Sequence, residues 1–269
     1  MPLSITFDDG RSIQHEKYYP ILDRFDLSGT FYIVTNWISK RGFMDLDNLI
    51  DLWKSHNEIG SHTHTHARLS SLTDEEVVFE LETSKSYLSH FDCTTLAYPF
   101  GDYSERIALL AANYYSGART YLPSKAGNKG PDYDSDTRNR RYALDALPME
   151  HSINPGQPSL ISLNLPQFKT NIENIVNKAV EQKAWTILVF HGPENPSLQY
   201  LAQKVLKHPM DAIRNVQIVS GSIKNSDLDD AINKFQWLCE FLAANEKIQV
   251  MTVAKAIKYF NDSSASSKN

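Results

Sequence analysis

Several apolar, strand-like runs in this chain end directly on residues that can carry chemistry. Residues 3–7 (Leu-Ser-Ile-Thr-Phe) lead into Asp8-Asp9-Gly10, and the apolar run 185–190 leads into His191. Such runs, when they alternate with helical segments, are typical of a parallel α/β barrel, in which functional residues gather at the carboxyl ends of the strands. The sequence therefore predicts a barrel with its reactive residues at one end.

Helical segments do separate the runs. Thr73 and Glu76 form a capping box, and apolar residues at helical spacing follow them. A longer helix is predicted from Ser226 to about Asn245, because its apolar residues fall on one face. Further elements are predicted as strands at 29–34, 94–98 and 250–253 and as a helix at 254–260. Together these elements predict the α/β class.

Length and charge set limits on the class of protein. A chain of 269 residues that is 41% hydrophobic suits one barrel domain, predicted over residues 1–260, with a polar, disordered tail at 261–269. A net charge of −5 and a pI near 6.0 provide no basic field for nucleic acid. No apolar run is long enough for a membrane span, and a strand at Leu3 stands where a signal peptide would begin, so we expect a cytoplasmic location.

Two acids and three histidines form the first candidate site. Adjacent carboxylates such as Asp8 and Asp9 repel each other, so a fold that keeps them together often gives one a metal and leaves the other to move protons. His62 and His66 are four residues apart, which on one helical turn places both imidazoles on one face, with His64 pointing elsewhere. With one carboxylate they match the three-ligand set of an open catalytic metal site. Solvated histidines in a polar loop are the alternative.

Four motifs, in this order, carry a resemblance to a known family. They are Thr6-Phe7-Asp8-Asp9-Gly10, the stretch from His62 to His66, Tyr98-Pro99-Phe100-Gly101, and Leu188-Val189-Phe190-His191. In this pattern the chain resembles the polysaccharide deacetylases, carbohydrate esterase family 4, also called the NodB-homology domain. The resemblance implies a distorted (β/α) barrel with about seven strands and a metal-dependent N-deacetylase activity on N-acetylated sugars.

The resemblance also implies roles for individual residues. By this likeness Asp9, His62 and His66 bind a divalent metal, Asp8 is the general base and His191 is the general acid. These residue types suit amide hydrolysis, which needs an activated water, a stabilised oxyanion and a protonated leaving amine. Two imidazoles and one carboxylate favour Zn²⁺, although Co²⁺, Ni²⁺ or Fe²⁺ fit the same ligands.

Residues of the third and last motifs are candidates for the substrate pocket. By the same likeness the backbone N–H of Phe100 is an oxyanion donor, Leu188 lines the pocket for the acetyl methyl group, and Tyr98 belongs to the pocket. Aromatic residues that could stack on a sugar are Trp37, Tyr103 and Tyr133. Each of them can equally fill the core or the surface.

The chain departs from the family pattern in two places. Common members carry an arginine that pairs with the catalytic aspartate at the position of Ala97, and the family's fourth motif has no clean match between residues 119 and 147. We hypothesise that Arg140 or Arg141 supplies the missing cation to Asp8, although solvated surface arginines are the alternative. Candidates to orient His191 are Asp132, Asp134 and Asp136.

The residues favour a metal-dependent amide hydrolase, and the resemblance implies that it removes N-acetyl groups from a sugar, an oligosaccharide or a polysaccharide. A metal-dependent C–N hydrolase of a small non-sugar amide is the first alternative, and a catalytically silent carbohydrate-binding protein is the second. A long open groove would favour a polymer and a closed pocket a small amide, and the sequence leaves this choice, the metal and the oligomeric state open. An intact base, acid and ligand set argues against the silent binder.

Overall fold

The centre of the molecule is a curled parallel sheet. The computed structural model describes residues 1–120, 141–150, 158–192 and 225–266. Strands in the described residues follow the order β5-β4-β3-β2-β1-β7-β6, with β8 paired to the start of β1, and all their pairings are parallel. Their bounds are β1 Pro2–Phe7, β2 Thr30–Ile33, β3 Glu58–Ser61, β4 Thr95–Ala97, β5 Gly117–Arg119, β6 Leu147–Pro148, β7 Thr186–Phe190 and β8 Gln249–Val250.

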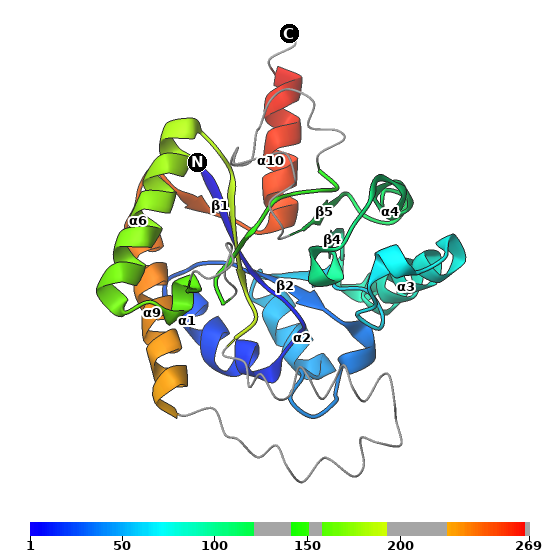
Figure 1. The fold of residues 1–269 in the computed structure, drawn as a ribbon, viewed down its shortest axis with the longest axis horizontal. Coiled ribbons are helices and arrows are strands. Elements are labelled where there is room, and N and C mark those ends of the chain that lie inside the picture. Colours follow the sequence, from blue (N-terminus) through cyan, green and yellow to red (C-terminus); the bar gives the residue numbers. More distant parts are fainter. Residues whose placement is uncertain (121–140, 151–157, 193–224, 267–269) are drawn as a thin grey trace.

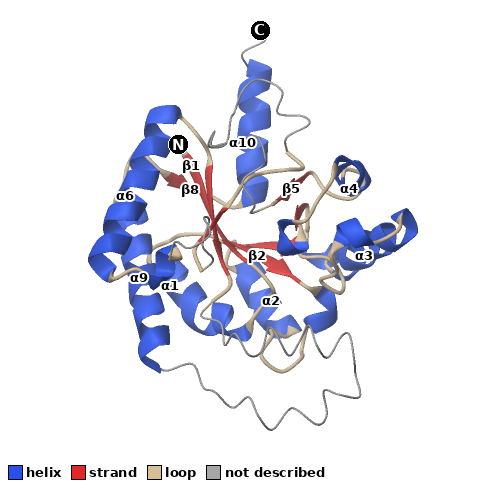
Figure 2. Ribbon diagram, in the orientation of Figure 1, coloured by secondary structure: helices blue, strands red, loops and turns tan. Residues whose placement is uncertain are grey.

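Helices surround the strands on the outside (Figures 1 and 2). The α-helices described are α1 Tyr19–Arg24, α2 Leu46–Lys54, α3 Asp74–Tyr87, α4 Glu105–Ala111, α6 Leu165–Gln182, α9 Asn225–Ala243 and α10 Val253–Ser266. Shorter turns are the π-helix η1 Gln14–Tyr18 and the 3₁₀ segments η2 Thr35–Trp37, η3 Leu69–Ser71, η4 Ser89–Phe91, η5 Pro99–Gly101 and η6 Leu160–Ser162. The arrangement confirms the predicted α/β barrel, and the capping box of Thr73 and Glu76 starts α3 as expected.

One short segment, residues 144–148, joins β5 on one side of the barrel to β7 on the other. Leu144 forms a parallel bridge with Arg119 of β5, and its backbone N–H donates to the carbonyl of Ala118 at 3.0 Å. A few residues later, β6 pairs with β7 through Leu147 and Leu188. Because this segment is short and only partly paired, the barrel is distorted, as predicted.

The C-terminal elements differ from the prediction. The closing strand is Gln249–Val250 instead of 250–253, and α10 begins at Val253. The helix then continues to Ser266, so residues 261–266 of the expected disordered tail are helical. A helix that has been nucleated by a packed first turn gains one hydrogen bond for each residue added. Polar composition alone was therefore a poor indicator of disorder here.

Alternation along the central strands directs polar groups to the inside of the barrel. Leu3, Ile5 and Phe7 of β1 belong to the main hydrophobic core, and the Phe7 ring lies 5.8 Å from that of Phe235 on α9. Successive side chains on a strand point to opposite faces, so the intervening Ser4 and Thr6 face the barrel interior. Polar side chains of the strands therefore lie on the inner face of the barrel, including those near the carboxyl ends of the strands.

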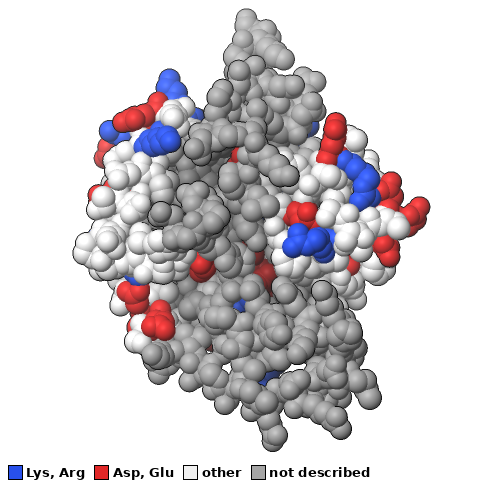
Figure 3. Space-filling view, viewed as in Figure 1, with Lys and Arg blue, Asp and Glu red and all other residues white. Residues whose placement is uncertain are grey.

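The described surface carries charges of both signs. In Figure 3, basic and acidic side chains lie next to one another among uncharged residues. None of the described helices combines the length and the apolar character that crossing a lipid bilayer requires.

Candidate metal and catalytic site

A strained turn presents the two aspartates. The last ladder bond of β1 runs from the Asp8 N–H to the Phe190 carbonyl at 2.9 Å. The backbone then turns through positive φ angles at Asp9 (77°) and Gly10 (70°). A positive φ at a residue other than glycine costs free energy and persists where the surrounding structure imposes it, often at functional sites. The turn is what brings both carboxylates to the mouth of the barrel.

The two predicted histidine ligands lie in a loop after β3, which corrects the expected helical turn. The loop has positive φ angles at Thr63 (66°) and His66 (63°). The buried carboxylate of Glu80, on α3, accepts hydrogen bonds from the backbone N–H groups of His64 (2.9 Å) and Thr65 (2.8 Å). These left-handed residues fold the loop back, so the spacing of four still brings two imidazoles together, although no helix forms.

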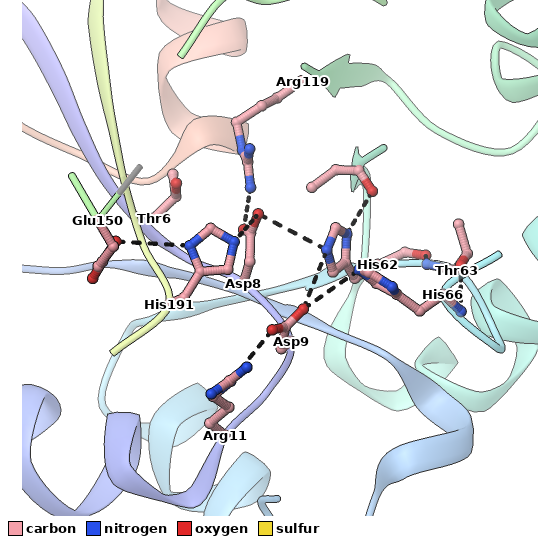
Figure 4. A network of polar contacts seen from close by, with 12 residues as sticks. Thr6, Asp8, Asp9, Arg11, His62, Thr63, His66, Arg119, Glu150 and His191 are labelled. Atoms are coloured by element: carbon pink, nitrogen blue, oxygen red, sulfur yellow. Dashed lines mark hydrogen bonds and ion pairs between the residues drawn. The ribbon is translucent and has the colours of Figure 1, made fainter. Parts of the chain in front are cut away.

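Asp9, His62 and His66 converge as predicted (Figure 4). One potential ligand atom from each lies within 4.8 Å of the other two, and Asp9 Oδ1 is 3.7 Å from His62 Nε2 and 3.5 Å from His66 Nε2. His62 Nδ1 lies 2.8 Å from the carbonyl of Ala97, which as an acceptor selects the tautomer with a lone pair on Nε2. This donor set fits a divalent metal with an open position.

The protonation states of these groups also suit a metal. Burial lowers the pKa of His62, and burial followed by the neighbouring His62 lowers the pKa of His66 to about 3. Burial alone would raise the pKa of Asp9, but the nearby His66, His191 and Arg11 lower it overall. Neutral imidazoles and an ionised carboxylate are the forms that bind metal.

Asp8 is held as a carboxylate with one oxygen available. The guanidinium of Arg119 pairs with Oδ1 of the fully buried Asp8. Its Oδ2 is buried and has no hydrogen-bond partner in the described chain, and it lies 3.8 Å from Nε2 of both His62 and His191. Burial would raise the pKa of Asp8, but the charge of Arg119 lowers it overall. A buried, charged oxygen without a donor is suited to accept a proton.

Arg119 takes the role that we had expected of Arg140 or Arg141. Arg140 lies outside the described residues. The guanidinium of Arg141 lies over the ring of Tyr142, 5.7 Å from the ring centroid. Arg119 ends β5 and is the register partner of Ala97 on β4. Register partners on neighbouring strands share a face of the sheet, so an arginine one strand away reaches the same carboxylate. The sequence signal that could have identified Arg119 is a cation at the end of a short strand-like run.

His191 lies on the other side of Asp8 and has an acidic neighbour that the sequence analysis missed. Its Nδ1 is 3.7 Å from Oε2 of Glu150, which follows β6. Burial would lower the pKa of His191, but Glu150 first, and then Asp8 and Asp9, raise it to about 9. Glu150 follows an apolar pair at a strand end, and this pattern could have found it. The aspartates proposed for this role, Asp132, Asp134 and Asp136, lie outside the described residues.

Aromatic rings flank His66. Phe100, in η5 directly after β4, has a positive φ of 60°, and its ring centroid lies 4.6 Å from that of His66. The ring centroid of Trp37 lies 5.1 Å from the ring centroid of His66. Tyr98 is buried, and its ring stacks on Tyr103 at 5.5 Å. Phe100 and Trp37 therefore border the candidate metal ligands, whereas Tyr98 and Tyr103 pack on each other.

Leu188 does not occupy the predicted pocket position. It is buried in the main core together with Phe190. Because side chains alternate along a strand, Val189 projects to the same face as His191, and Leu188 projects to the opposite face. The prediction for Leu188 is therefore wrong by one residue, since Val189 and not Leu188 lies on the face that carries His191. The remaining stacking candidate, Tyr133, lies outside the described residues.

Fold and site together define an α/β barrel with a candidate hydrolase centre at its strand ends, and comparisons with known proteins agree. The family model for polysaccharide deacetylases matches residues 2–116. Over these residues the chain is similar to the polysaccharide deacetylases, the family that its motifs resemble. The matched region holds the two aspartates and the two candidate ligand histidines, while Arg119, Glu150 and His191 follow it.

Individual relatives are distant. A poly-beta-1,6-N-acetyl-D-glucosamine N-deacetylase of Staphylococcus aureus is 28% identical over 114 residues, which cover 36% of this chain and 39% of that protein. A chitin deacetylase of Arthroderma benhamiae is 24% identical over 208 residues, 76% of this chain and 47% of that protein. The chain thus spans less than half the length of these relatives.

A solved structure supports the fold. The family 4 carbohydrate esterase from Streptomyces lividans, in complex with acetate, superimposes with a TM-score of 0.54 at 10% sequence identity. The match covers 92% of this chain and 90% of that chain. At this identity the similarity shows a shared architecture, the distorted α/β barrel.

Proposed function

We propose that this chain removes N-acetyl groups from an N-acetylated carbohydrate and that it uses a divalent metal to do so. One observation carries the proposal. The cluster of Asp9, His62 and His66 lies beside an ionised carboxylate, Asp8, and a histidine with a raised pKa, His191. The relatives support the carbohydrate, since their names specify chitin and poly-N-acetylglucosamine as substrates.

The residues divide the chemistry between them. A divalent metal held by Asp9, His62 and His66 would lower the pKa of water and polarise the acetyl carbonyl. Asp8 Oδ2, which carries no other hydrogen bond in the described chain, accepts the proton of the attacking water. His191, protonated below about pH 9, donates a proton to the departing nitrogen. The products are acetate and a free amine.

Zn²⁺ is the metal we favour. Two imidazole nitrogens and one carboxylate oxygen form the ligand set of many catalytic zinc sites, with a further position left for substrate or water. Co²⁺, Ni²⁺ and Fe²⁺ accept the same ligands, so the choice among these metals is part of the test.

Aromatic rings at the site support a sugar as the substrate. The rings of Trp37 and Phe100 lie beside the ring of His66 and are only partly buried, and the guanidinium of Arg68 lies over the Phe100 ring. Aromatic faces provide apolar contact area that suits the C–H faces of a sugar ring. A small non-sugar amide is the alternative substrate.

The test is acetate release by the purified protein after chelation and after the return of Zn²⁺ or Co²⁺. Substrates are N-acetylglucosamine oligomers of increasing length and a set of small non-sugar amides. We expect metal-dependent acetate from the oligomers. Metal-dependent hydrolysis of the small amides alone would support the alternative, and metal binding without hydrolysis of any substrate would overturn both.

A further inference from the structure

A single buried side chain joins the backbones of the proposed base and acid. Gln14 is fully buried and begins the π-helix η1. Its side-chain amide donates to the carbonyl oxygen of Asp8 at 2.5 Å and to that of His191 at 3.0 Å. One amide group therefore binds both residues between which the reacting groups would lie.

These two carbonyls lie beyond the regular sheet. β1 and β7 are paired up to Phe7 and Phe190, and the last bond between them is donated by the Asp8 N–H. After these strands the two backbone segments turn away from the sheet through positive φ angles, 77° at Asp9 and 93° at Gly192. Gln14 thus replaces the next rung of the ladder at the point where both backbones leave the sheet.

The connection has a cost that stability alone does not explain. Gln14 Oε1 is buried and has no hydrogen-bond partner among the described residues. A buried carbonyl without a donor is unfavourable, because it has lost its hydrogen bonds to water. The π-helix that carries Gln14 is itself a rare conformation, frequently found at functional sites. Both features indicate that the position of this amide is selected for what it holds.

We infer that Gln14 is a positioning residue that sets the spacing between Asp8 and His191. The inference rests on the proposed function, because it takes Asp8 as the base and His191 as the acid. Their nearest charged atoms, Asp8 Oδ2 and His191 Nε2, lie 3.8 Å apart. With both backbones held by one amide, the two side chains keep this separation, and each can reach the same reacting group in turn.

The test replaces Gln14 with residues of similar size that cannot donate to both carbonyls. Gln14→Glu places an acceptor against two carbonyls, and Gln14→Met removes the hydrogen bonds without adding charge. We expect kcat to fall about 10- to 100-fold, since small displacements of catalytic groups have effects of this size. KM should stay within about twofold, since the lost interaction acts in the transition state. Metal content should not change, because no metal ligand is altered.

Asn57→Asp is the matched control. Asn57 is also a buried carboxamide, and its Nδ2 donates to the backbone carbonyls of Leu52 (3.2 Å) and Ser55 (3.3 Å). It precedes β3 and so lies at the opposite end of the strands from the site. Asn57→Asp, like Gln14→Glu, keeps an acceptor and loses both donors. We expect this variant to lower Tm and leave kcat unchanged.

The outcomes separate the inference from the proposed function. If the wild-type protein releases acetate and both Gln14 variants keep its kcat while losing stability as Asn57→Asp does, Gln14 is merely structural and the inference is overturned. If the wild-type protein releases no acetate, the proposed function fails. In that case crystal structures of the wild type and Gln14→Met decide, and an unchanged separation of Asp8 from His191 overturns the inference.

Discussion

Two carboxylates from the same sheet show how the two ends of the barrel differ. Asp8, at the carboxyl end of β1, is paired with Arg119 and keeps one buried oxygen without a donor in the described chain. Glu58, at the start of β3, is surrounded by neutral donors. Its Oε2 accepts from the hydroxyl of Thr30 and the N–H of Ala254, both at 2.9 Å, and its Oε1 accepts from the hydroxyl of Thr95.

The difference shows which surroundings keep a buried acid ionised and reactive and which use it only to hold the fold together. A cation lowers the pKa of Asp8, whereas burial raises the pKa of Glu58 against the effect of its hydrogen bonds. Glu58 satisfies the first turn of α10 and links it to β2 and β4, so its hydrogen-bonding capacity is used for packing. Asp8 is ionised and incompletely bonded, and this leaves it free to react.

The largest expected effect separates the proposed base, Asp8, from the proposed metal ligands. Asp8→Asn should keep its metal and lose about 10²- to 10⁴-fold in kcat, the usual contribution of a general base. His62→Ala and Asp9→Ala should lose the metal itself. Metal content by mass spectrometry and acetate release check this prediction.

His64→Ala is the control for the histidine variants. His64 belongs to the same loop, but its Nδ1 lies 2.9 Å from the hydroxyl of Thr35 and it is no part of the ligand cluster. It should keep both metal and activity. Wild-type turnover by Asp8→Asn would contradict the assigned roles.

The second effect concerns the cation. Arg119→Ala should destabilise the protein by about 3–5 kcal/mol, because it leaves the charge of Asp8 buried without a partner. The double variant Ala97→Arg/Arg119→Ala returns an arginine to the register position on β4 and should recover part of the stability and the turnover. Urea unfolding at pH 7 and kcat measure both. If the double variant is no better than Arg119→Ala, the two positions are not equivalent.

The third effect is a shift in pH dependence. The pKa of His191 is raised from 6.5 to about 9, so its contribution to stability is complete below about pH 6.5 and is lost as the pH rises through about 9. Glu150→Gln should lower this pKa, because it removes the first of the charges that raise it. NMR titration of the His191 ring in the metal-free protein gives the value directly. The alkaline limb of kcat/KM should move to lower pH in the variant, and an unmoved limb would exclude His191 as the acid.

The smallest effect is expected at Glu58. Its raised pKa means that ionisation opposes folding, so the favourable contribution is complete below the unfolded pKa and is lost as the pH rises through the folded one. Glu58→Gln removes this dependence. Relative to the variant, the wild type should lose stability as the pH increases, while kcat stays the same. Unfolding curves of both proteins between pH 4 and 8 are the measurement, and a loss of turnover in Glu58→Gln would end the contrast with Asp8.

Residues close together in sequence were the predictable part of the site. Asp8 and Asp9 share a turn, and His62 and His66 share a loop, so their patterns were visible in short stretches of sequence. The strand-like runs that precede them follow from apolar residues and turn signals, which are local as well. The order of the elements therefore predicted the α/β class, and the resemblance carried by the four motifs implied the barrel.

The partners of these residues could not be predicted from local patterns. Arg119 reaches Asp8 because β5 lies at a particular register beside β4, and Glu150 reaches His191 because β6 lies beside β7. Registers are set by packing across the whole sheet. The prediction for Leu188 failed on a single step of strand parity, since a shift of one residue moves a side chain to the other face.

The register of Ala97 with Arg119 has a consequence for how such sites are found in genomes. A comparison of sequences column by column meets Ala97 where the resemblance implies an arginine, so by the column alone the cation beside Asp8 is missing. In space the guanidinium is present, supplied from the neighbouring strand. A site of this kind is better defined by the positions its charges occupy than by the columns that encode them, and chains set aside as inactive for a missing arginine merit a second search of the adjacent strand.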